Sequence, residues 1–324
     1  MDKQSRALFD AAILNEACIR FGIHPNQAQL LDGFENQLFE CSRQNGPVIL
    51  RIAHSLHRSP SQTEAELDWL RHLKAHQVRV AGPLASERGA WVEVLPARDG
   101  SCFSAACFEK AAGRHPRRAD WTPKLFEQMG RLMGHMHRLA RTYTPQAARP
   151  HWHAEQINFA ARYLPPGNQA VIEQHNQLLE HLLALPTTPE QYGLIHQDMH
   201  SGNFFIHEGQ ITLFDFDDCA YGAYAYDIAM ALFYILPHHC TAQEIPLARN
   251  FLQPFLQGYH LENDLPLNCL AHIPAFLKLR EIDLYVAIHR SLDLNDLDAW
   301  CASFMDGRKR SEEHTSELQS PNTI

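Results

Sequence analysis

The sequence lacks the features that would direct this chain to a membrane, an oxidising compartment or nucleic acid. Its eight cysteines stand singly with no C-x-x-C pair, as expected for buried thiols in a reducing compartment. No apolar run approaches the ~20 residues that a membrane-spanning helix needs, and the first residues do not form a secretory apolar segment. A formal net charge of −9 provides no basic surface for nucleic acid. We therefore expect a cytoplasmic protein without membrane or nucleic-acid partners, and the sequence leaves its oligomeric state unknown.

What is present is the composition of an ordinary globular protein. Apolar residues make up 45% of the 324 positions and charged residues 20%, which is enough for one large domain or two lobes. Residues 310–320 differ from the rest, because they resemble the translation of a sequencing-library adapter. We expect residues 310–324 to be an artefactual disordered tail and the natural C-terminus to be missing.

Strand and turn signals dominate the chain before residue 110. They predict a helix over residues 5–21 and then five strands over residues 29–31, 37–41, 47–53, 90–95 and 101–108. A second helix opens after Pro60, where Ser61 and Glu64 have the spacing of a capping box. The buried stripe expected on this helix consists of Leu67, Leu70 and Leu73.

Helical periodicity dominates after Gly113. It predicts helices over residues 123–141, 169–185 and 268–292, with one β-hairpin within residues 203–214. The change from sheet to helix predicts an α+β chain of two lobes, residues 1–109 and 110–309, with a cleft between them.

Three polar residues should meet at one end of the predicted hairpin. Asp198 and Asn203 follow His196 in the pattern H-x-D-x-x-x-x-N, and Asp215 follows the returning strand. Antiparallel pairing places the start of one strand beside the end of the other, so Asn203 and Asp215 should be neighbours. Two acids and an amide oxygen suit Mg²⁺, and phosphoryl transfer needs a metal together with an aspartate near the attacking hydroxyl. We assign Asp198 as the catalytic base, Asn203 and Asp215 as metal ligands, and His196 as a supporting residue.

Two other interpretations fit parts of this pattern. The segment could be an ordinary hairpin with exposed polar residues at its base. Alternatively, His196, Asp198 and His200 could share one face of an extended segment and bind a hydrolytic metal. The full pattern, which ends in Phe-Asp-Phe-Asp at residues 214–217, favours phosphoryl transfer, and a hydrolytic metal would leave the sheet-rich lobe without a role.

The sheet-rich lobe can supply the nucleotide half of such a site. Gly33 and Asn36 lie in a strand–turn–strand whose N–H groups could cover phosphates. Arg51 interrupts an otherwise apolar strand and, if buried, needs an acidic partner. We expect that partner to be Glu66 on the capped helix, because Glu64 suits the cap. A surface position for Arg51 is the simpler alternative.

These motifs resemble the aminoglycoside phosphotransferase superfamily, near its bacterial homoserine kinase-like and stress-response kinase-like members. The resemblance covers residues 25–290 through the segments 34–39, 48–51, 66–70, 108–113, 130–137, 195–205, 214–219 and 226–229. It implies the bilobal protein-kinase-like fold, with a five-stranded antiparallel sheet and helix in the N-lobe and a mainly helical C-lobe. It also implies ATP and Mg²⁺ as cofactors, an alcohol group as acceptor, and a nucleotide-binding role for the first lobe.

The resemblance assigns roles at matching positions. It implies that Asp198 is the catalytic aspartate, that Asn203 and Asp215 are magnesium ligands, and that Arg51 binds phosphate. The inter-lobe hinge matches residues 108–113, which include Glu109 and Ala111 and whose backbone groups would hold adenine.

The same resemblance gives Asp227 a structural role and exposes two departures. Asp227 matches an acid that braces the catalytic loop, and it could also cap a helix over residues 228–236. The family usually has glycine where Gln197 stands, and many members have lysine where Arg51 stands. Arginine keeps its charge and can bind phosphate bidentately.

The acceptor pocket of this superfamily lies among C-terminal helices, and the sequence describes it least. Candidate residues there are Asp218, Arg280, Asp283 and Tyr285. Arg280 could meet a carboxylate and Asp283 an amine, or these residues could form pairs on a solvated helix face. Asp217 and Asp218 lie nearer the chemistry and could attract a cationic acceptor, water or metal.

We therefore expect an ATP-dependent phosphotransferase that acts on a hydroxyl of a small metabolite, such as an amino alcohol, an amino acid or a sugar-like compound. The alternatives are a Ser/Thr protein kinase of the stress-response type and a non-catalytic nucleotide-binding module. The pattern does not separate antibiotic resistance from a housekeeping role, because the acceptor pocket decides between them.

Overall fold

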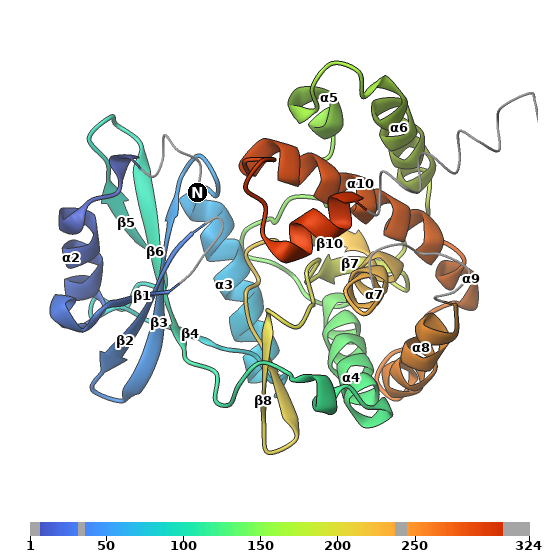
Figure 1. Ribbon diagram of the computed structural model, residues 1–324. Coiled ribbons are helices and arrows are strands. Elements are labelled where there is room, and N and C mark those ends of the chain that lie inside the picture. The colour runs from blue at the N-terminus through green and yellow to red at the C-terminus, as the bar shows by residue number, and fades with distance from the viewer. Residues whose placement is uncertain (1–6, 32–35, 237–244, 307–324) are drawn as a thin grey trace, which may run out of the picture.

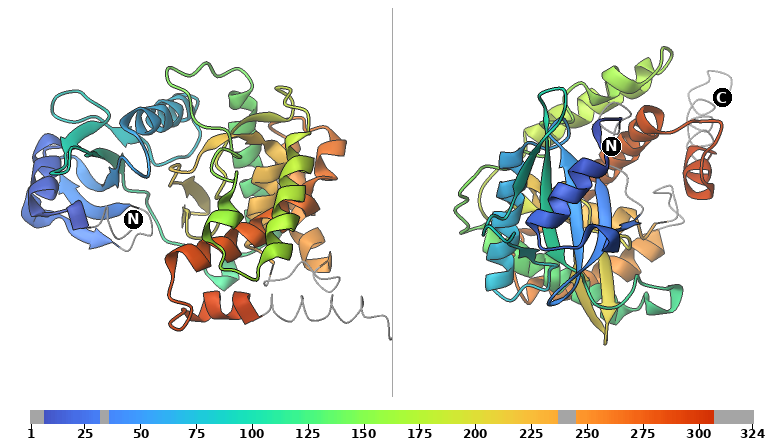
Figure 2. Two further views of the ribbon diagram at one scale, coloured as in Figure 1. Left: turned by 90° about the horizontal axis from the view of Figure 1, so that it is seen from above. Right: turned by 90° about the vertical axis from the view of Figure 1, so that its left-hand side faces the viewer.

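The computed structural model describes residues 7–31, 36–236 and 245–306. Within these ranges the chain forms a sheet-rich N-lobe and a mainly helical C-lobe, joined after residue 109 (Figures 1 and 2). The predicted α+β two-lobe fold is confirmed. Gly33 and the tail over residues 310–324 lie outside the described residues.

The N-lobe sheet is antiparallel with the order β1-β2-β3-β6-β4, and β5 also pairs with β6. Its strands are β1 (Gln29–Leu31), β2 (Gln37–Arg43), β3 (Gly46–His54), β4 (Pro83–Leu84), β5 (Glu93–Pro96) and β6 (Cys102–Glu109). The prediction of five strands missed β4, because this strand has two residues and follows a Gly-Pro pair that indicates a break. Helix α2 (Ala11–Arg20), capped by Asp10, covers the outer face, and a short 3₁₀ turn, η1 (Pro25–Gln27), follows it.

Helix α3 (Pro60–Ala75) lies between the sheet and the C-lobe (Figure 1). Its capping box uses Ser59 and Gln62 rather than the predicted Ser61 and Glu64, so the helix begins two residues earlier than that pair requires. The predicted stripe is buried, but its leucines join the core of the C-lobe and not that of the N-lobe. Helix α3 is therefore anchored to the catalytic lobe while one of its acids faces the sheet.

The helices of the C-lobe are α4 (Pro123–Ala140), α5 (Phe159–Tyr163), α6 (Gln169–Leu183), α7 (Tyr224–Phe233), α8 (Ile245–His260), α9 (Leu267–Leu270) and α10 (Ile273–Ser291), with a 3₁₀ turn η2 (Arg118–Asp120) before α4. Helix α8 packs on α4, α10 packs on α7, and α5 and α6 pack on α10. The predicted helix over residues 268–292 is interrupted between α9 and α10, and Pro274 lies in the first turn of the longer helix. Helices α4 and α8 approach closely, because a Cβ at Gly130 would lie 1.8 Å from the carbonyl oxygen of Phe255.

Two small sheets support the loops between these helices. The predicted hairpin is confirmed as β8 (Phe204–His207) and β9 (Gln210–Leu213). A second pair, β7 (Tyr192–Ile195) and β10 (Ala220–Ala223), was not predicted. Both segments are four residues long and far apart in sequence, so neither gives a hairpin signal. Strand β7 leads directly into the H-x-D pattern.

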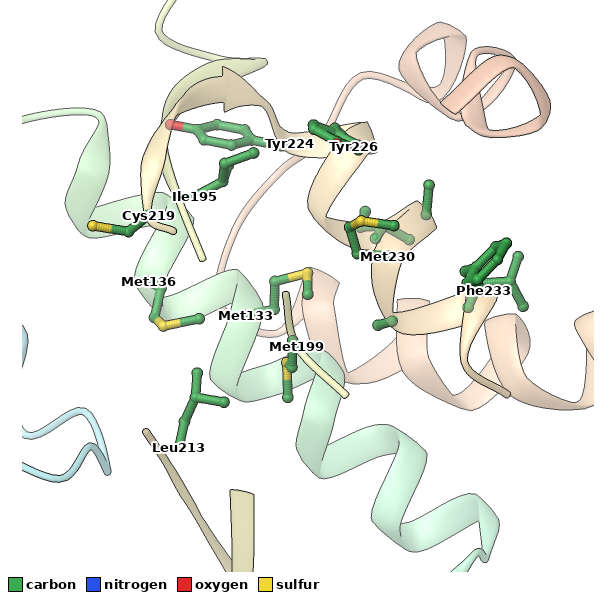
Figure 3. Packing of buried hydrophobic residues seen from close by; sticks show 14 of the residues in the cluster. Met133, Met136, Ile195, Met199, Leu213, Cys219, Tyr224, Tyr226, Met230 and Phe233 are labelled. Carbon is green, nitrogen blue, oxygen red and sulfur yellow. The ribbon is translucent and has the colours of Figure 1, made fainter. Parts of the chain in front are cut away.

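The core of the C-lobe lies beneath these strands (Figure 3). Methionines from α4, α7 and the loop after β7 meet there, together with Leu213 of β9 and Cys219. Flexible methionine side chains fill irregular space between elements that meet at different angles. Among the described residues, no helix is both long enough and apolar enough to cross a lipid bilayer.

Candidate active site

Asp198, Asn203 and Asp215 meet as predicted at one end of the hairpin. The Phe214 N–H donates to the Asn203 carbonyl at 2.9 Å, which closes the base of the hairpin. The side-chain amide of Asn203 donates to the backbone carbonyl of Asp198 at 2.8 Å and to its Oδ2 at 3.1 Å. All three side chains line the same cavity.

A buried acid holds the start of the loop that carries Asp198 and Asn203. Asp227 accepts hydrogen bonds from the N–H groups of His196 and Gln197, at 3.1 and 2.8 Å, and its Oδ2 lies 3.0 Å from His137 Nε2. The bracing hydrogen bonds implied by the family resemblance are present. The helix-cap interpretation is wrong, because α7 begins at Tyr224, three residues before Asp227.

His196 connects the two sides of this loop. Its Nε2 lies 3.1 Å from the carbonyl oxygen of Phe214, and its Nδ1 accepts from the Asp198 N–H at 3.2 Å. These two contacts fit a neutral ring that is protonated on Nε2. Burial lowers the pKa of His196, which favours the same neutral form. His196 was predicted to be a supporting residue, and in the structure its ring contacts the backbone of Phe214 and of Asp198.

Gln197 has a left-handed backbone, with a φ of 71°. Glycine adopts this region at little cost, whereas other L-residues are strained there by roughly 1–2 kcal/mol. This explains why glycine is usual at the matching position of the family. In this chain the hydrogen bond to Asp227 holds the strained residue in place.

Arg280 and His200 both contact the carboxylate of Asp198. Arg280 of α10 donates from Nη2 to Asp198 Oδ1 at 3.1 Å, and His200 Nε2 lies 3.2 Å from Oδ2. Arg280 also contacts the hydroxyl of Tyr234, whose ring packs against His200 at 4.6 Å. Burial alone would raise the pKa of Asp198, but the hydrogen bond from His200 and the charge of Arg280 outweigh it and hold that pKa well below its usual range. Asp198 is therefore a carboxylate at neutral pH.

The sequence prediction missed the roles of His200 and Tyr234. His200 drew notice only as a possible hydrolytic-metal ligand, and Tyr234 carries no motif. Among the described residues, no group of three or more His, Cys, Asp or Glu side chains could hold a metal by itself. His196 and His200 instead use their ring nitrogens on the loop and on Asp198, which argues against the hydrolytic-metal alternative.

Asp215 faces the cavity from a left-handed position with a φ of 63°. Desolvation within the cleft, and then the neighbouring charge of Asp217, raise the pKa of Asp215 to about 7, although Arg51 opposes them. Such a concentration of acid charge beside the amide of Asn203 is the donor set that a hard divalent cation binds. The residues present therefore fit a magnesium ion.

Arg51 and Glu66 form the opposite wall. Arg51 Nη1 and Nη2 donate to the two oxygens of Glu66 at 2.8 and 2.5 Å, and both side chains are buried. Arg51 also lies over the ring of Phe108, 5.0 Å from its centroid, and 3.6 Å from Asp217. The predicted pairing with Glu66 is confirmed, and the surface alternative for Arg51 is wrong.

The cavity between these walls has a volume of about 790 Å³, within the usual range for small-molecule sites. Predicted residues that line it are Asn36, Arg51, Glu66, Glu109, Ala111, Asp198, Asn203, Asp215, Asp217 and Asp218. Strand β6 ends at Glu109, and the chain then passes to the C-lobe, so the predicted hinge lies at one end of the cavity.

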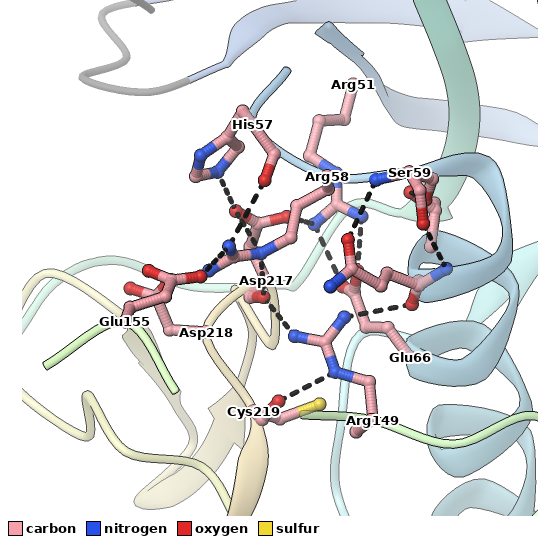
Figure 4. A network of polar contacts seen from close by, with 12 residues as sticks. Arg51, His57, Arg58, Ser59, Glu66, Arg149, Glu155, Asp217, Asp218 and Cys219 are labelled. Atoms are coloured by element: carbon pink, nitrogen blue, oxygen red, sulfur yellow. Dashed lines mark hydrogen bonds and ion pairs between the residues drawn. The ribbon is translucent and has the colours of Figure 1, made fainter. Parts of the chain in front are cut away.

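Asp217 and Asp218, which line the cavity, belong to a dense polar network (Figure 4). His57 donates to Asp217 at 2.6 Å, and this contact with Arg51 and Arg58 nearby keeps the pKa of Asp217 low despite its burial. Arg58 Nη2 donates to Asp218 at 2.6 Å, and 54% of the Asp218 side chain is still exposed. Asp217 is therefore buried and paired with arginine and histidine, whereas more than half of the Asp218 side chain stays exposed.

The other acceptor-pocket predictions need correction. Asp283 is buried and points to α6, 3.3 Å from His175 Nε2, because α10 packs against α6 at that turn. The Tyr285 hydroxyl donates to Asn168 at 2.9 Å, at the start of α6. Neither residue lines the cavity. Arg280, which could have met a substrate carboxylate, contacts Asp198 instead.

Comparison with known proteins agrees with this geometry. Residues 26–267 match the model of the phosphotransferase enzyme family, and the chain belongs to that family. It is an ATP-dependent phosphotransferase that uses a divalent cation, typically Mg²⁺, and acts on a small-molecule hydroxyl.

Particular relatives sharpen this placement. The chain is 35% identical to amicoumacin kinase of Bacillus subtilis (strain 168) over 311 residues, which cover 94% of this chain and 93% of that protein. The structure of amicoumacin kinase hAmiN with AMP-PNP, Ca²⁺ and Ami superposes with a TM-score of 0.89 at 34% identity, over 97% of each chain. A microcompartment-associated aminopropanol kinase shares the fold, with a TM-score of 0.74 at 23% identity over 95% of this chain and 98% of that one.

Proposed function

We propose that this chain transfers the γ-phosphoryl group of ATP to a hydroxyl of an amine-bearing small molecule, with amicoumacin as the first candidate acceptor. The observation that carries the proposal is the position of Asp198, Asn203 and Asp215 on one cavity that Arg51 and Glu66 face from the other lobe. The similarity to amicoumacin kinase over nearly the whole chain supports the choice of acceptor.

Each residue would have a distinct role in the reaction. Asp198 accepts the proton as the acceptor hydroxyl attacks the γ-phosphorus and ADP leaves. Asn203 and Asp215 would hold magnesium, which neutralises charge on the phosphates when bound. Arg51, fixed by Glu66, points its charge at the same phosphates, and backbone groups at Glu109 and Ala111 hold the adenine.

Carboxylates at the edge of the site favour an amine on the acceptor. Asp218 lines the cavity with more than half of its side chain exposed. Arg58 joins it to Glu155, which is 63% exposed, so two carboxylates share one arginine. The excess of acid over base leaves negative charge there for an ammonium group.

The proposal is tested with purified protein, ATP-Mg²⁺ and a panel of amicoumacin, amino alcohols, hydroxy amino acids and sugars. We expect one amine-bearing compound to be phosphorylated, as detected by mass spectrometry. Asp198→Asn should lower kcat by about 10²–10⁴-fold while the protein stays folded, because it removes proton acceptance but keeps the shape. Asp264→Asn, on an exposed loop, is the matched control. Phosphorylation of protein substrates with no product in the panel would favour a protein kinase and contradict the proposal.

A further inference from the structure

Arg149 is a buried arginine at the junction of the two lobes that no sequence motif singled out. Only 4% of the residue is exposed. It lies beside the polar network of Asp217, Arg58 and Glu66 (Figure 4). Its guanidinium donates from Nε to the carbonyl oxygen of Cys219 at 2.7 Å.

The other two nitrogens of Arg149 also donate to backbone carbonyls. Nη2 contacts the carbonyl oxygen of Asp217, and Nη1 contacts that of Gln62 at 2.9 Å. Within the described ranges Arg149 forms no salt bridge with a carboxylate. A buried charge without an ion pair is costly, and charged hydrogen bonds offset that cost only while all three carbonyls keep their places.

The three carbonyls belong to the two walls of the active site. Asp217 and Cys219 lie two and four residues after Asp215, the candidate metal ligand. Gln62 lies in the first turn of α3, one turn before Glu66, the partner of Arg51. A single guanidinium therefore connects the segment after Asp215 to the helix that orients the phosphate-facing arginine.

The chain that follows Arg149 is hydrogen-bonded to strand β10. The Tyr221 N–H donates to the carbonyl of Pro150 and the Trp152 N–H donates to the carbonyl of Tyr221, both at 2.9 Å, so this segment runs along β10. The ring of Trp152 is buried against Tyr226, 5.5 Å between centroids. The guanidinium is thus attached to the rigid core and not to a mobile surface.

We propose that Arg149 is a positioning residue for the nucleotide and its metal: it sets the distance between Asp215 and the Arg51–Glu66 pair. The planar guanidinium reaches three carbonyls in different directions at once, which a lysine ammonium on a flexible stem does not reproduce. Loss of these contacts removes the direct link between the segment after Asp215 and α3 and leaves only the contacts of Asp217 with Arg51, His57 and Arg58, so that the two walls are held less firmly at one distance.

The test measures binding and needs no acceptor. Titration calorimetry of Arg149→Gln and Arg149→Lys with a non-hydrolysable ATP analogue is repeated over a range of Mg²⁺ concentrations. We expect the Mg²⁺ concentration for half-maximal nucleotide binding to rise about tenfold in Arg149→Gln and less in Arg149→Lys. Added guanidinium ion at low concentration should restore part of the loss in the glutamine variant only.

A matched control separates positioning from general stability. Arg131→Gln removes an exposed arginine of α4 that pairs with Glu262, and it should leave Mg²⁺-dependent binding unchanged. If a folded Arg149 variant, judged by its metal-free melting curve, binds the nucleotide with the Mg²⁺ dependence of the parent chain, the proposal is wrong. If Arg149→Gln does not fold, the same criterion is applied to Arg149→Lys, which keeps the charge: an unchanged Mg²⁺ dependence of nucleotide binding contradicts the proposal. A failed acceptor screen would leave this result unaffected.

Discussion

The nucleotide-facing and acceptor-facing halves of the site are built from partners at different distances along the chain. On the nucleotide side, Arg51 pairs with Glu66 15 positions away, and Asn203 holds Asp198 from 5 positions away. On the acceptor side, Arg280 reaches Asp198 from 82 positions away. These two nucleotide-side pairs therefore form within a strand–helix unit and a hairpin, whereas the Arg280 contact depends on how α10 packs.

The two halves also differ in charge. The nucleotide side holds paired arginines with the acid Asp215 facing the cavity, an arrangement suited to phosphate and metal. On the acceptor side Arg280 pairs with Asp198, and 23% of the arginine side chain stays exposed. Substitutions on the nucleotide side should therefore weaken ATP binding, and substitutions on the acceptor side should lower kcat. The following predictions test that separation.

The largest expected effect is on the nucleotide side. Glu66→Ala leaves Arg51 buried without its bidentate partner, and breaking a buried pair in this way costs about 3–5 kcal/mol of unfolding free energy. We expect a value near the lower end, because Asp217 lies 3.6 Å from Arg51. Urea unfolding measures it, and affinity for an ATP analogue should fall too. Glu64→Ala, at an exposed position of the same helix, should change neither. If Glu64→Ala lowered the free energy of unfolding as much as Glu66→Ala, the Arg51–Glu66 pair would not be the source of this stability.

On the acceptor side, Arg280→Gln should reduce kcat by about 10–100-fold, because Asp198 Oδ1 loses the contact that orients it. Affinity for the ATP analogue should stay within about twofold, since Arg280 does not line the nucleotide cavity. Lys278→Gln, which removes a neighbouring cation paired with Glu281, is the control. A parallel loss of nucleotide affinity would show that the two halves are not separable in this way.

A smaller effect concerns the pH dependence of Asp215. Its pKa of about 7 lies above the usual value near 4 of an unfolded chain, so the metal-free folded state binds a proton between these values. The free energy of unfolding should therefore rise as pH falls from about 7 towards about 4, and affinity for Mg²⁺ should weaken by up to about tenfold per pH unit below 7. Chemical unfolding in chelator and Mg²⁺ titrations measure the two trends. Asp215→Asn should remove both, and trends that persist in that variant would assign them to another group.

The smallest effect is expected at Gln197. Gln197→Gly should raise the free energy of unfolding by about 0.5–1 kcal/mol, because glycine relieves the left-handed strain at a cost in unfolded-state entropy. Gln77, with a φ of 64°, is a matched residue outside the site, and Gln77→Gly should give a similar gain. Only the change at Gln197 should alter kcat, because only that residue lies in the catalytic loop. A loss of stability at Gln197 alone would mean that its side chain contributes more than its backbone costs.

Local signals were sufficient for much of the nucleotide half. The hairpin of β8 and β9, the pairing of Arg51 with Glu66 and the meeting of Asn203 with Asp215 were predictable, because alternation, turns and antiparallel register act over a few residues. Errors occurred where competing signals lay close together. The cap of α3 is Ser59 and not the predicted Ser61. Strand β4 has only two residues, which is too short for a sequence pattern to indicate.

The sequence by itself determined the class of chemistry, because the residues of the catalytic loop, the hairpin and the strand-borne arginine lie within short segments of defined geometry. Only the tertiary structure decided where distant side chains meet. It turned Arg280 onto Asp198, directed Asp283 and Tyr285 towards α6, and placed Arg149 between the walls of the site. The physical reason is that these contacts follow from the packing angles of whole helices, which depend on the shape of the buried core and have no short-range signal in the chain.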